Sequence, residues 1–241
     1  MKAFELVYIC AEPFLPVLEQ VVHSRLLHLA KTYPSRPRFL DVGGRKSHYT
    51  IGIRADVTVT DLPRESSTQR HLNLGLTDEM VEQVRKRRSN IEAILYDDMT
   101  HSKLEDNSFD CVVAVEVLEH VEEDLNFITE VRRVLKPNGV FLMTTPNGDF
   151  IVNVGNPDHK RHYTREQLLQ HLRSTFLEVE VQYAVVDGIY HTMGLKDWSL
   201  KQPLTSMMAM IANVVNSVQS MGKRIGGKAY GTHHLVATGR K

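Results

Sequence analysis

The chain has 241 residues, which is enough to bury one substantial hydrophobic core, so we expect a single domain with small additions. Its 29 basic residues balance 29 acidic ones, so no net field would draw it to nucleic acid or an anionic membrane. The two cysteines form neither a disulfide framework nor a zinc motif, and the sequence shows no signal peptide and no apolar run of about 18 residues, which predicts a cytoplasmic protein without a transmembrane segment.

The predicted elements begin with a helix and then alternate. Apolar side chains at helical spacing predict a helical cap over residues 12–33, with two prolines tolerated near its start. Strands are expected at 39–42, 56–60, 91–96, 109–115 and 140–144, and helices at 77–88, 121–135 and 164–172. The strands are apolar on both faces, which predicts a parallel sheet covered by helices on each side. The cationic run 85–88 is expected to form a solvated helix face.

The end of the chain departs from simple alternation. Two more strands are expected at 179–186 and 234–238, and the roughly 45 residues between them are too many for a hairpin loop. Within this insert, the methionine-rich segment 204–218 has an amphipathic helix pattern. Core packing or a lid is the first interpretation, and a surface for an apolar acceptor, a partner or a second copy is the alternative. One domain over 1–241 then divides into a cap (1–37), a core (38–187), an insert (188–232) and a last strand (233–241).

Several strands end in residues that suit a nucleotide-like ligand. Gly43 and Gly44 directly follow the first strand, and glycines there let the backbone approach a ligand closely. Asp61 ends the second strand, where a carboxylate can accept both hydrogen bonds of a ribose diol. A plain turn explains the two glycines equally well when they are taken alone.

The third strand is followed by a further acidic pair. Asp98 could accept from an exocyclic adenine amine while the amide of Met99 donates to the ring, and Asp97 is an adjacent competitor for this role. A solvated turn aspartate is the alternative interpretation of this position. The order of strand, glycine turn and acidic residues therefore points to one ligand at the carboxyl edge of the sheet.

Five segments together resemble class I S-adenosylmethionine (SAM)-dependent methyltransferases. They are LDVGG at 40–44, VTVTD at 57–61, DDMTHSKLEDNSFD at 97–110, VEVLEHV at 115–121 and RRVLKPNGVFLMTTPN at 132–147. The resemblance covers about residues 36–187 and implies an α/β fold: a doubly wound, mostly parallel, seven-stranded Rossmann-like sheet with an antiparallel last strand. By this resemblance, the methionine part of SAM would lie beside Asp41, Gly43 and Gly44, its ribose on Asp61 and its adenine on Asp98 and Met99.

The glycine turn departs from the family's pattern. Arg45 and Ser47 occupy positions where the family usually has glycine. Their side chains could narrow the space beside the amino-acid tail of SAM, or Arg45 could pair with its carboxylate. This departure keeps a methyltransferase-like binding protein without catalysis as an alternative.

A second constellation follows the fourth strand. Glu116, Glu119 and His120 have the i, i+3, i+4 spacing of one side of a helical turn, and His159 lies further on. Two carboxylates and two imidazoles can bind a divalent cation. The E-x-x-E-H pattern, with T-P-N and a later histidine, resembles the metal site of small-RNA 2′-O-methyltransferases, which implies Mg or Mn. Ubiquinone-pathway O-methyltransferases are similar in the EVLEHV-like segment. Besides its predicted metal role, Glu116 is predicted to be a cofactor-binding residue.

A metal-free reading of the same residues stays open. Many methyltransferases of this class carry the Glu-His pair without a metal, and Glu119 and His120 would then order the pocket wall. His120 is the candidate general base, because an unperturbed imidazole titrates near pH ~6.5. His162 is a second catalytic candidate, and Tyr163 beside it either borders the substrate or packs.

The sequence therefore predicts a SAM-dependent methyltransferase that acts on oxygen of a small or medium-sized acceptor, such as a natural product, a sugar or a lipid-linked molecule. A nucleic-acid substrate is not expected from the balanced charge. A nicotinamide-dependent oxidoreductase is the rival enzyme class, although no G-x-G-x-x-G follows the first strand.

Overall fold

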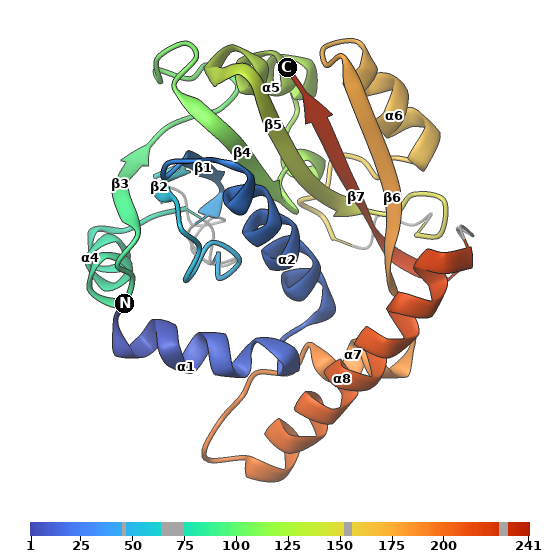
Figure 1. Cartoon of the computed structure of the whole chain (residues 1–241). Coiled ribbons are helices and arrows are strands. Elements are labelled where there is room, and N and C mark those ends of the chain that lie inside the picture. Colours follow the sequence, from blue (N-terminus) through green and yellow to red (C-terminus); the bar gives the residue numbers. More distant parts are fainter. Residues whose placement is uncertain (45–46, 64–74, 152–155, 227–230) are drawn as a thin grey trace.

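A seven-stranded sheet runs through the molecule in the order β3-β2-β1-β4-β5-β7-β6 (Figure 1). The computed structural model describes residues 1–44, 47–63, 75–151, 156–226 and 231–241. The strands are β1 (Arg38–Val42), β2 (Asp56–Asp61), β3 (Ile91–Tyr96), β4 (Phe109–Val115), β5 (Leu135–Pro146), β6 (Glu178–Val186) and β7 (Thr232–Arg240). Neighbouring strands from β3 to β5 pair in parallel, and β7 runs antiparallel to β5 and β6. The predicted fold class is confirmed.

Both faces of the sheet are buried, as the apolar strands predicted. Along β4, Cys111 and Val113 belong to one core cluster, while Val112 and Ala114 belong to the other. The first cluster packs under α2 (Val17–Thr32), and the second packs under α5 (Asp124–Val134) and α6 (Arg165–Arg173) (Figure 1). The chain leaves β1 toward β2 and β3 and then returns to β4 on the other side. Such a reversal of direction marks the carboxyl ends of β1 and β4 as the place where α/β proteins bind ligands.

Helix ends follow the predicted caps. Thr77 accepts a hydrogen bond from the amide of Met80 at the start of α4 (Asp78–Arg87). Thr164 and Gln167 form the predicted capping box at the start of α6. Where α5 ends, the chain passes directly into β5, and Asn138 in the Lys-Pro-Asn-Gly segment has a φ of 64°.

The N-terminal cap is two helices rather than one. An additional helix, α1 (Ala3–Ala11), precedes a short η1 (Glu12–Phe14), and the prolines at 13 and 16 separate it from α2. Glu5 is fully buried and accepts hydrogen bonds from the amide and hydroxyl of Ser89, at 2.7 and 3.0 Å. This acidic residue interrupts the apolar run in the sequence, yet it anchors α1 to the segment after α4.

No single helix in the described part of the chain is long and apolar enough to cross a membrane. The segments Ala3–Phe14 and Val17–Thr32 satisfy the length and composition test only as a pair bent by 118°.

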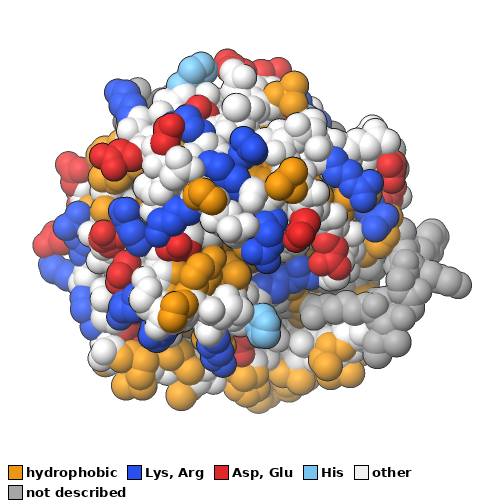
Figure 2. Space-filling model, turned by 45° about the horizontal axis from the view of Figure 1, so that its top comes forward, with side chains coloured by type: hydrophobic (Ala, Val, Ile, Leu, Met, Phe, Trp, Pro, Cys, Tyr) orange, Lys and Arg blue, Asp and Glu red, His pale blue; other side chains and the backbone are white. Residues whose placement is uncertain are grey.

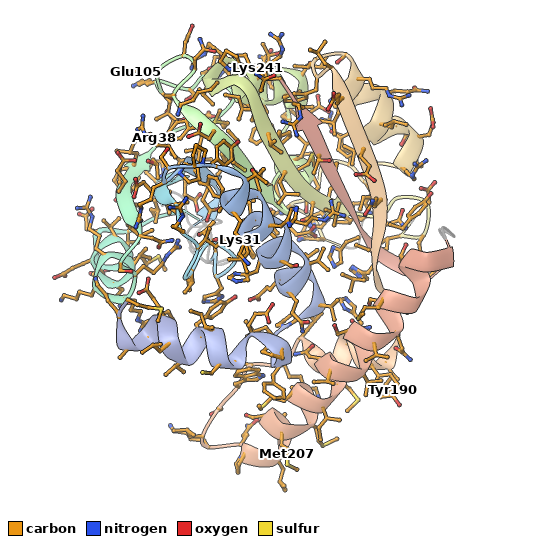
Figure 3. All side chains as sticks on the ribbon, in the orientation of Figure 1. Lys31, Arg38, Glu105, Tyr190, Met207 and Lys241 are labelled. Atoms are coloured by element: carbon orange, nitrogen blue, oxygen red, sulfur yellow. The ribbon has the colours of Figure 1, made fainter. Side chains whose placement is uncertain are left out.

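The methionine-rich helix turns its apolar side chains toward solvent, whereas core packing would have turned them inward. This helix, α8 (Pro203–Gly226), follows α7 (Ile189–Gly194), and both lie with α1 beyond the ends of β4 and β5 (Figure 1). Met207, Met208 and Ile211 are 52%, 51% and 56% exposed. Figure 3 shows Met207 pointing away from the body of the protein. The core-packing part of the first interpretation is therefore wrong for these side chains, and the lid stays a prediction.

The inward face of α8 is made of small and polar residues. Asn213 donates to the carbonyl oxygens of Phe14 and Gly194 at 2.8 and 3.1 Å. Asn216 donates to the carbonyl oxygen of Val186 at 2.7 Å, and the hydroxyl of Ser220 accepts from the amide of the same valine. These side chains satisfy backbone groups at the end of β6 and in the helical cap, which an apolar face would leave unpaired.

The inverted packing of α8 predicts unequal effects for two similar substitutions. Asn216→Leu should lower the free energy of unfolding by about 2 kcal/mol, because it leaves the partly buried carbonyl of Val186 without its donor. Gln219→Leu on the exposed side should change it by no more than about 0.5 kcal/mol. Urea unfolding followed by circular dichroism measures both. Equal effects would contradict this orientation of the helix.

Candidate functional site

The carboxyl ends of four adjacent strands bring the predicted ligand residues to one edge. The amide of Gly43, just after β1, donates to the carbonyl of Thr60 in β2 at 2.8 Å. Asp61 is paired with Tyr96 of β3, and the amide of Asp97 donates to the carbonyl of Asp61 at 3.2 Å. The glycine turn and both acidic segments therefore lie in a row along this edge.

Packing inside the protein itself requires the two glycines of the turn. Gly43 has a φ of +69°, and a Cβ there would meet Val117 at 2.8 Å. At Gly44, a Cβ would lie 2.4 Å from the carboxyl carbon of Asp41. The sequence suggested that a ligand needs this space, whereas neighbouring side chains already occupy it. Arg45, the departure from the family pattern, lies outside the described residues.

A buried polar network holds Asp41 beneath this turn. The hydroxyl of Thr50 donates to Asp41 at 3.1 Å and accepts from the guanidinium of Arg88 at 2.5 Å. Arg88 also donates to the carbonyl of Ser47 at 3.3 Å and is itself buried, which corrects the prediction that the whole basic run is solvated. Burial raises the pKa of Asp41 to about 6, although hydrogen bonds and Arg88 oppose the rise.

The two aspartates after β3 are held in different ways. Asp98 is exposed, and its Oδ1 accepts from the amide and hydroxyl of Thr100 at 2.9 and 2.8 Å. Met99 is buried. Asp97 Oδ1 accepts from the amide of Lys103 at 3.0 Å, while its buried Oδ2 has no hydrogen-bond partner among the described residues. Asp97 thus keeps its place as the competitor for the adenine role.

Glu116 turns away from the other predicted metal ligands. It has a φ of 53° and stands between β4 and the short η3 (Leu118–His120), so the expected regular helical turn does not form. Its carboxylate accepts from the hydroxyl of Thr144 at 2.8 Å and lies 3.2 Å from Nδ1 of His234. Its direction is therefore set by the first residues of β7 rather than by Glu119.

The remaining three predicted ligands do converge. Glu119, His120 and His159 each offer one ligand atom, and these atoms lie within 4.8 Å of one another. Glu119 is fully buried; its Oε2 accepts from the hydroxyl of Thr145 at 3.3 Å, and its Oε1 has no hydrogen-bond partner among the described residues. This donor set of one carboxylate and two imidazoles fits a divalent cation in composition.

The two glutamates have opposite pKa shifts. Burial raises the pKa of Glu119 well above its usual range, and the charge of Glu116 adds to the rise. Burial also acts on Glu116, but His234 and Thr144 outweigh it and lower its pKa. The two surroundings therefore shift the pKa values of these neighbouring acids in opposite directions, which is how sites assign acid and base roles to neighbouring acids.

A chain of histidines leads inward from His120. Nδ1 of His120 lies 3.3 Å from the carbonyl oxygen of Asp158, an arrangement that leaves Nε2 as the basic nitrogen. Nδ1 of His159 lies 2.8 Å from Nε2 of His162, whose Nδ1 lies 3.0 Å from the carbonyl oxygen of Ile151. Both ring nitrogens of His162 therefore have partners, which favours a positioning role over contact with a substrate.

Tyr163 packs, as its second interpretation predicted. The side chain is buried, and its hydroxyl donates to the carboxylate of Asp124. Arg161 and His171 also contact that carboxylate, at 2.5 and 3.3 Å. This cluster fixes the segment that carries His159 and His162 against the start of α5.

Sequence reasoning missed a second group of histidines at the same edge. His191 of α7 and His233 and His234 of β7 each place one ligand atom within 4.8 Å of the others. Burial and the neighbouring imidazoles lower the pKa of His233 to about 4 and also lower that of His191. Only the adjacent His-His pair could have signalled this group in the sequence, because its third member is brought in by the fold.

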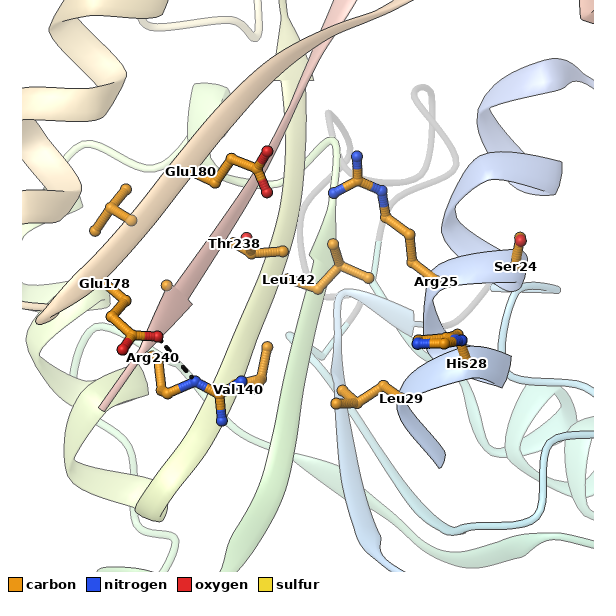
Figure 4. A pocket seen from close by; sticks show the side chains of 12 residues that line it. Ser24, Arg25, His28, Leu29, Val140, Leu142, Glu178, Glu180, Thr238 and Arg240 are labelled. Atoms are coloured by element: carbon orange, nitrogen blue, oxygen red, sulfur yellow. Dashed lines mark ion pairs between the residues drawn. The ribbon is translucent and has the colours of Figure 1, made fainter. Parts of the chain in front are cut away.

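A cavity lies elsewhere, on the α2 face of the sheet (Figure 4). Its volume is about 650 Å³, and it is lined by α2 and by β5, β6 and β7, with the ion pair of Arg240 and Glu178 at its rim. Val140 and Leu142 of β5 line it, and Thr144 is not among its lining residues. The predicted ligand, base and metal residues and the histidine group of α7 and β7 therefore lie outside this cavity.

Known proteins resemble this chain in sequence and in fold. A family model described as a methyltransferase domain matches residues 41–143. A probable S-adenosylmethionine-dependent methyltransferase of Mycolicibacterium smegmatis is 30% identical over 201 residues, covering 81% of this chain and 70% of that protein. One from Mycobacterium tuberculosis is 28% identical over 136 residues, covering 56% of this chain and 49% of that protein. The solved structure of a SAM-dependent methyltransferase from Archaeoglobus fulgidus has a TM-score of 0.58, with 92% of this chain and 94% of the other covered; at 15% identity it shows the fold alone.

The buried carboxyl of Asp41 predicts a pH-dependent stability. In the unfolded chain an aspartate titrates near ~3.9, so between that value and about 6 the folded state binds more protons. The contribution of Asp41 to the free energy of unfolding therefore falls as the pH rises through this window. Asp41→Asn removes the titration, so its stability relative to the wild type should improve by about 2 kcal/mol from about pH 4 to about pH 7. Urea unfolding at both pH values measures this, and a constant difference between the two proteins would contradict it.

Proposed function

The chain belongs to the SAM-dependent methyltransferases, and we propose that it transfers a methyl group to a hydroxyl oxygen of a small or medium-sized acceptor. The observation that carries the choice of oxygen is the group formed by Glu119, His120 and His159 at the carboxyl edge of the sheet. An imidazole there can take the proton of a hydroxyl as the methyl is transferred. A natural product, a sugar or a lipid-linked molecule would supply such a hydroxyl.

SAM, the cofactor of this family, supplies an electrophilic methyl group when it is bound. In the proposed arrangement the ribose hydroxyls are held by Asp61, and the adenine lies beside Asp98 and Met99. The methionine part lies along the turn shaped by Asp41, Gly43 and Gly44. Glu116, at the end of β4, is proposed as a further acidic residue that contacts SAM. The adjacency of these strand ends supports the assignment, because one extended ligand can reach all of them.

His120 is the proposed general base. Its Nδ1 faces a carbonyl oxygen, so the lone pair of Nε2 is available for a proton. Its ring also lies edge-on to His159, with centroids 4.7 Å apart, and burial and the neighbouring imidazoles lower the pKa of His159. A neutral His159 does not repel the positive charge that His120 would gain when it accepts the proton of the acceptor hydroxyl.

Assistance by Mg or Mn is the alternative for the same group. The composition of the set fits a divalent cation. Oε1 of Glu119 has no hydrogen-bond partner among the described residues, so it is available as a metal ligand. Glu119, His120 and His159 would hold the ion, which would lower the pKa of a bound hydroxyl. The fourth predicted ligand, Glu116, lies instead beside His234. Assays after chelation, with and without added Mg or Mn, separate this alternative from the metal-free base.

A small acceptor agrees with the distribution of charge. Acidic and basic side chains are intermixed on the face shown in Figure 2, and no continuous basic stripe crosses it. The chain as a whole is neutral. Long polyanions bind through many phosphate contacts with Lys and Arg, so they suit this surface poorly. A cytoplasmic location is part of this proposal.

The exposed face of α8 is proposed to pack against a second copy of the chain. Its exposed apolar residues recur at steps of three or four, the spacing that lets two helices pack along a seam. They are Leu204, Met207, Met208, Ile211, Val214, Val218 and Met221. Sedimentation equilibrium should reveal a dimer that Ile211→Lys abolishes and Gln219→Lys retains. A monomer at all concentrations would contradict this proposal.

Two substitutions should separate cofactor binding from catalysis. Asp61→Ala should weaken SAM binding by about 10- to 100-fold, because it removes a charged hydrogen-bond acceptor. His120→Ala should leave SAM affinity unchanged and lower turnover by about 10²- to 10⁴-fold. Calorimetry measures the first effect, and a screen of hydroxylated acceptors supplies the substrate for the second.

Matched controls change residues of the same types at other positions in the chain. Asp56→Ala changes the opposite end of β2, where the residue pairs with Arg36 at 2.9 Å, and should leave SAM affinity intact. His101→Ala removes an exposed imidazole and should leave turnover intact. Loss of SAM binding in His120→Ala would remove the base assignment. No heat on adding SAM to the wild type would favour the non-catalytic alternative.

A further inference from the structure

We infer that His191, His233 and His234 form a binding site for a divalent transition metal of the zinc type, separate from the group around Glu119. The site joins α7 to the first residues of β7, at the carboxyl edge of the sheet. It is independent of the acceptor and of the base proposed above. Three observations carry it: an unpaired buried nitrogen of His191, the close spacing of the three rings, and the carboxylate of Glu116 beside the ring of His234.

Two of the three imidazoles are buried, and one of these two has a nitrogen left unpaired. His191 and His234 are each only 7% exposed. Nε2 of His191 has no hydrogen-bond partner among the described residues, whereas Nδ1 of His234 lies 3.2 Å from the carboxylate of Glu116. Leaving a buried polar atom unpaired costs about 1–3 kcal/mol, so such atoms in a native protein indicate a missing partner.

The spacing of the rings suits a tetrahedral metal. Nδ1 of His233 lies 3.1 Å from Nε2 of His234. Two imidazole nitrogens bound to one zinc ion at about 2.1 Å are about 3.4 Å apart in tetrahedral geometry. The ring of His191 lies 4.5 Å from that of His233 and 5.8 Å from that of His234, between centroids. All three ligand atoms fall within 4.8 Å, so small side-chain rotations complete the set.

Glu116 stands where metal-binding histidines usually have a carboxylate. Its Oε2 lies 3.2 Å from Nδ1 of His234, and Thr144 fixes the other oxygen. A carboxylate at this place holds the proton of the ring on Nδ1 and directs the lone pair of Nε2 toward the metal. Nε2 is also the nitrogen that faces His233.

The backbone around the site is held in place. The amide of Asn147 donates to the carbonyl of His233 at 2.9 Å, and its side chain donates to the carbonyl of Thr232 at 3.1 Å. His234 is in register with Pro146 at the end of β5. Three imidazoles favour zinc and similar borderline metals over Mg, which prefers oxygen ligands.

The test uses full-length protein without a polyhistidine tag, after chelation and gel filtration. The wild type is expected to bind one equivalent of Co²⁺ with the visible absorption of a tetrahedral site, and zinc should displace it. His191→Gln and His234→Gln should lower zinc affinity, measured against a chromogenic chelator, by more than about 100-fold. Glu116→Gln should lower it by about 10-fold, because it removes only the supporting carboxylate.

Two matched variants locate the metal. His159→Gln changes the other histidine group and His28→Gln changes an exposed histidine, and both should bind zinc like the wild type. Circular dichroism confirms that each variant is folded, and Glu116→Gln keeps the test decisive if a histidine variant is not. The inference is overturned if the wild type binds no Co²⁺ in tetrahedral form. It is also overturned if affinity is lost in His159→Gln while it persists in His191→Gln.

Discussion

The burial of Asp41 under the glycine turn is the constraint on which the ligand edge depends. A carboxyl cannot be buried without partners, and here Thr50 links it to the guanidinium of Arg88. That link ties β1 to the loop after it and to the end of α4. Because the carboxyl fills the space beside Gly44, no larger residue fits there. The shape of the turn therefore follows from one buried charge and its neighbours.

The same edge separates two glutamates by their surroundings. Burial and the charge of Glu116 raise the pKa of Glu119, whereas His234 lowers the pKa of Glu116. The E-x-x-E-H pattern thus serves two groups rather than one. Glu119 joins His120 and His159, and Glu116 supports the histidines of α7 and β7. The antiparallel β7 makes this possible, because its first residues return to the carboxyl end of β5.

The insert shows why helix periodicity does not fix which face is buried. An amphipathic pattern states that two faces differ, and burial of the apolar one is the usual outcome. In α8 the backbone at the end of β6 and in the cap presents carbonyl and amide groups to the helix, and Asn213, Asn216 and Ser220 satisfy them. The free energy of leaving those groups unpaired outweighs the gain from burying the methionines.

Local patterning by itself determined the strands, the capped helices, the parallel sheet and the row of residues at the strand ends. These features depend on side-chain periodicity and on turn residues a few positions apart, such as Thr164 with Gln167. The tertiary structure alone decided that Arg88 is buried, that Glu116 faces His234 and that α8 turns its methionines outward. It also brought His191 to His233, 42 residues further along the chain. Contacts between distant segments are set by how the elements pack, and no local periodicity records them.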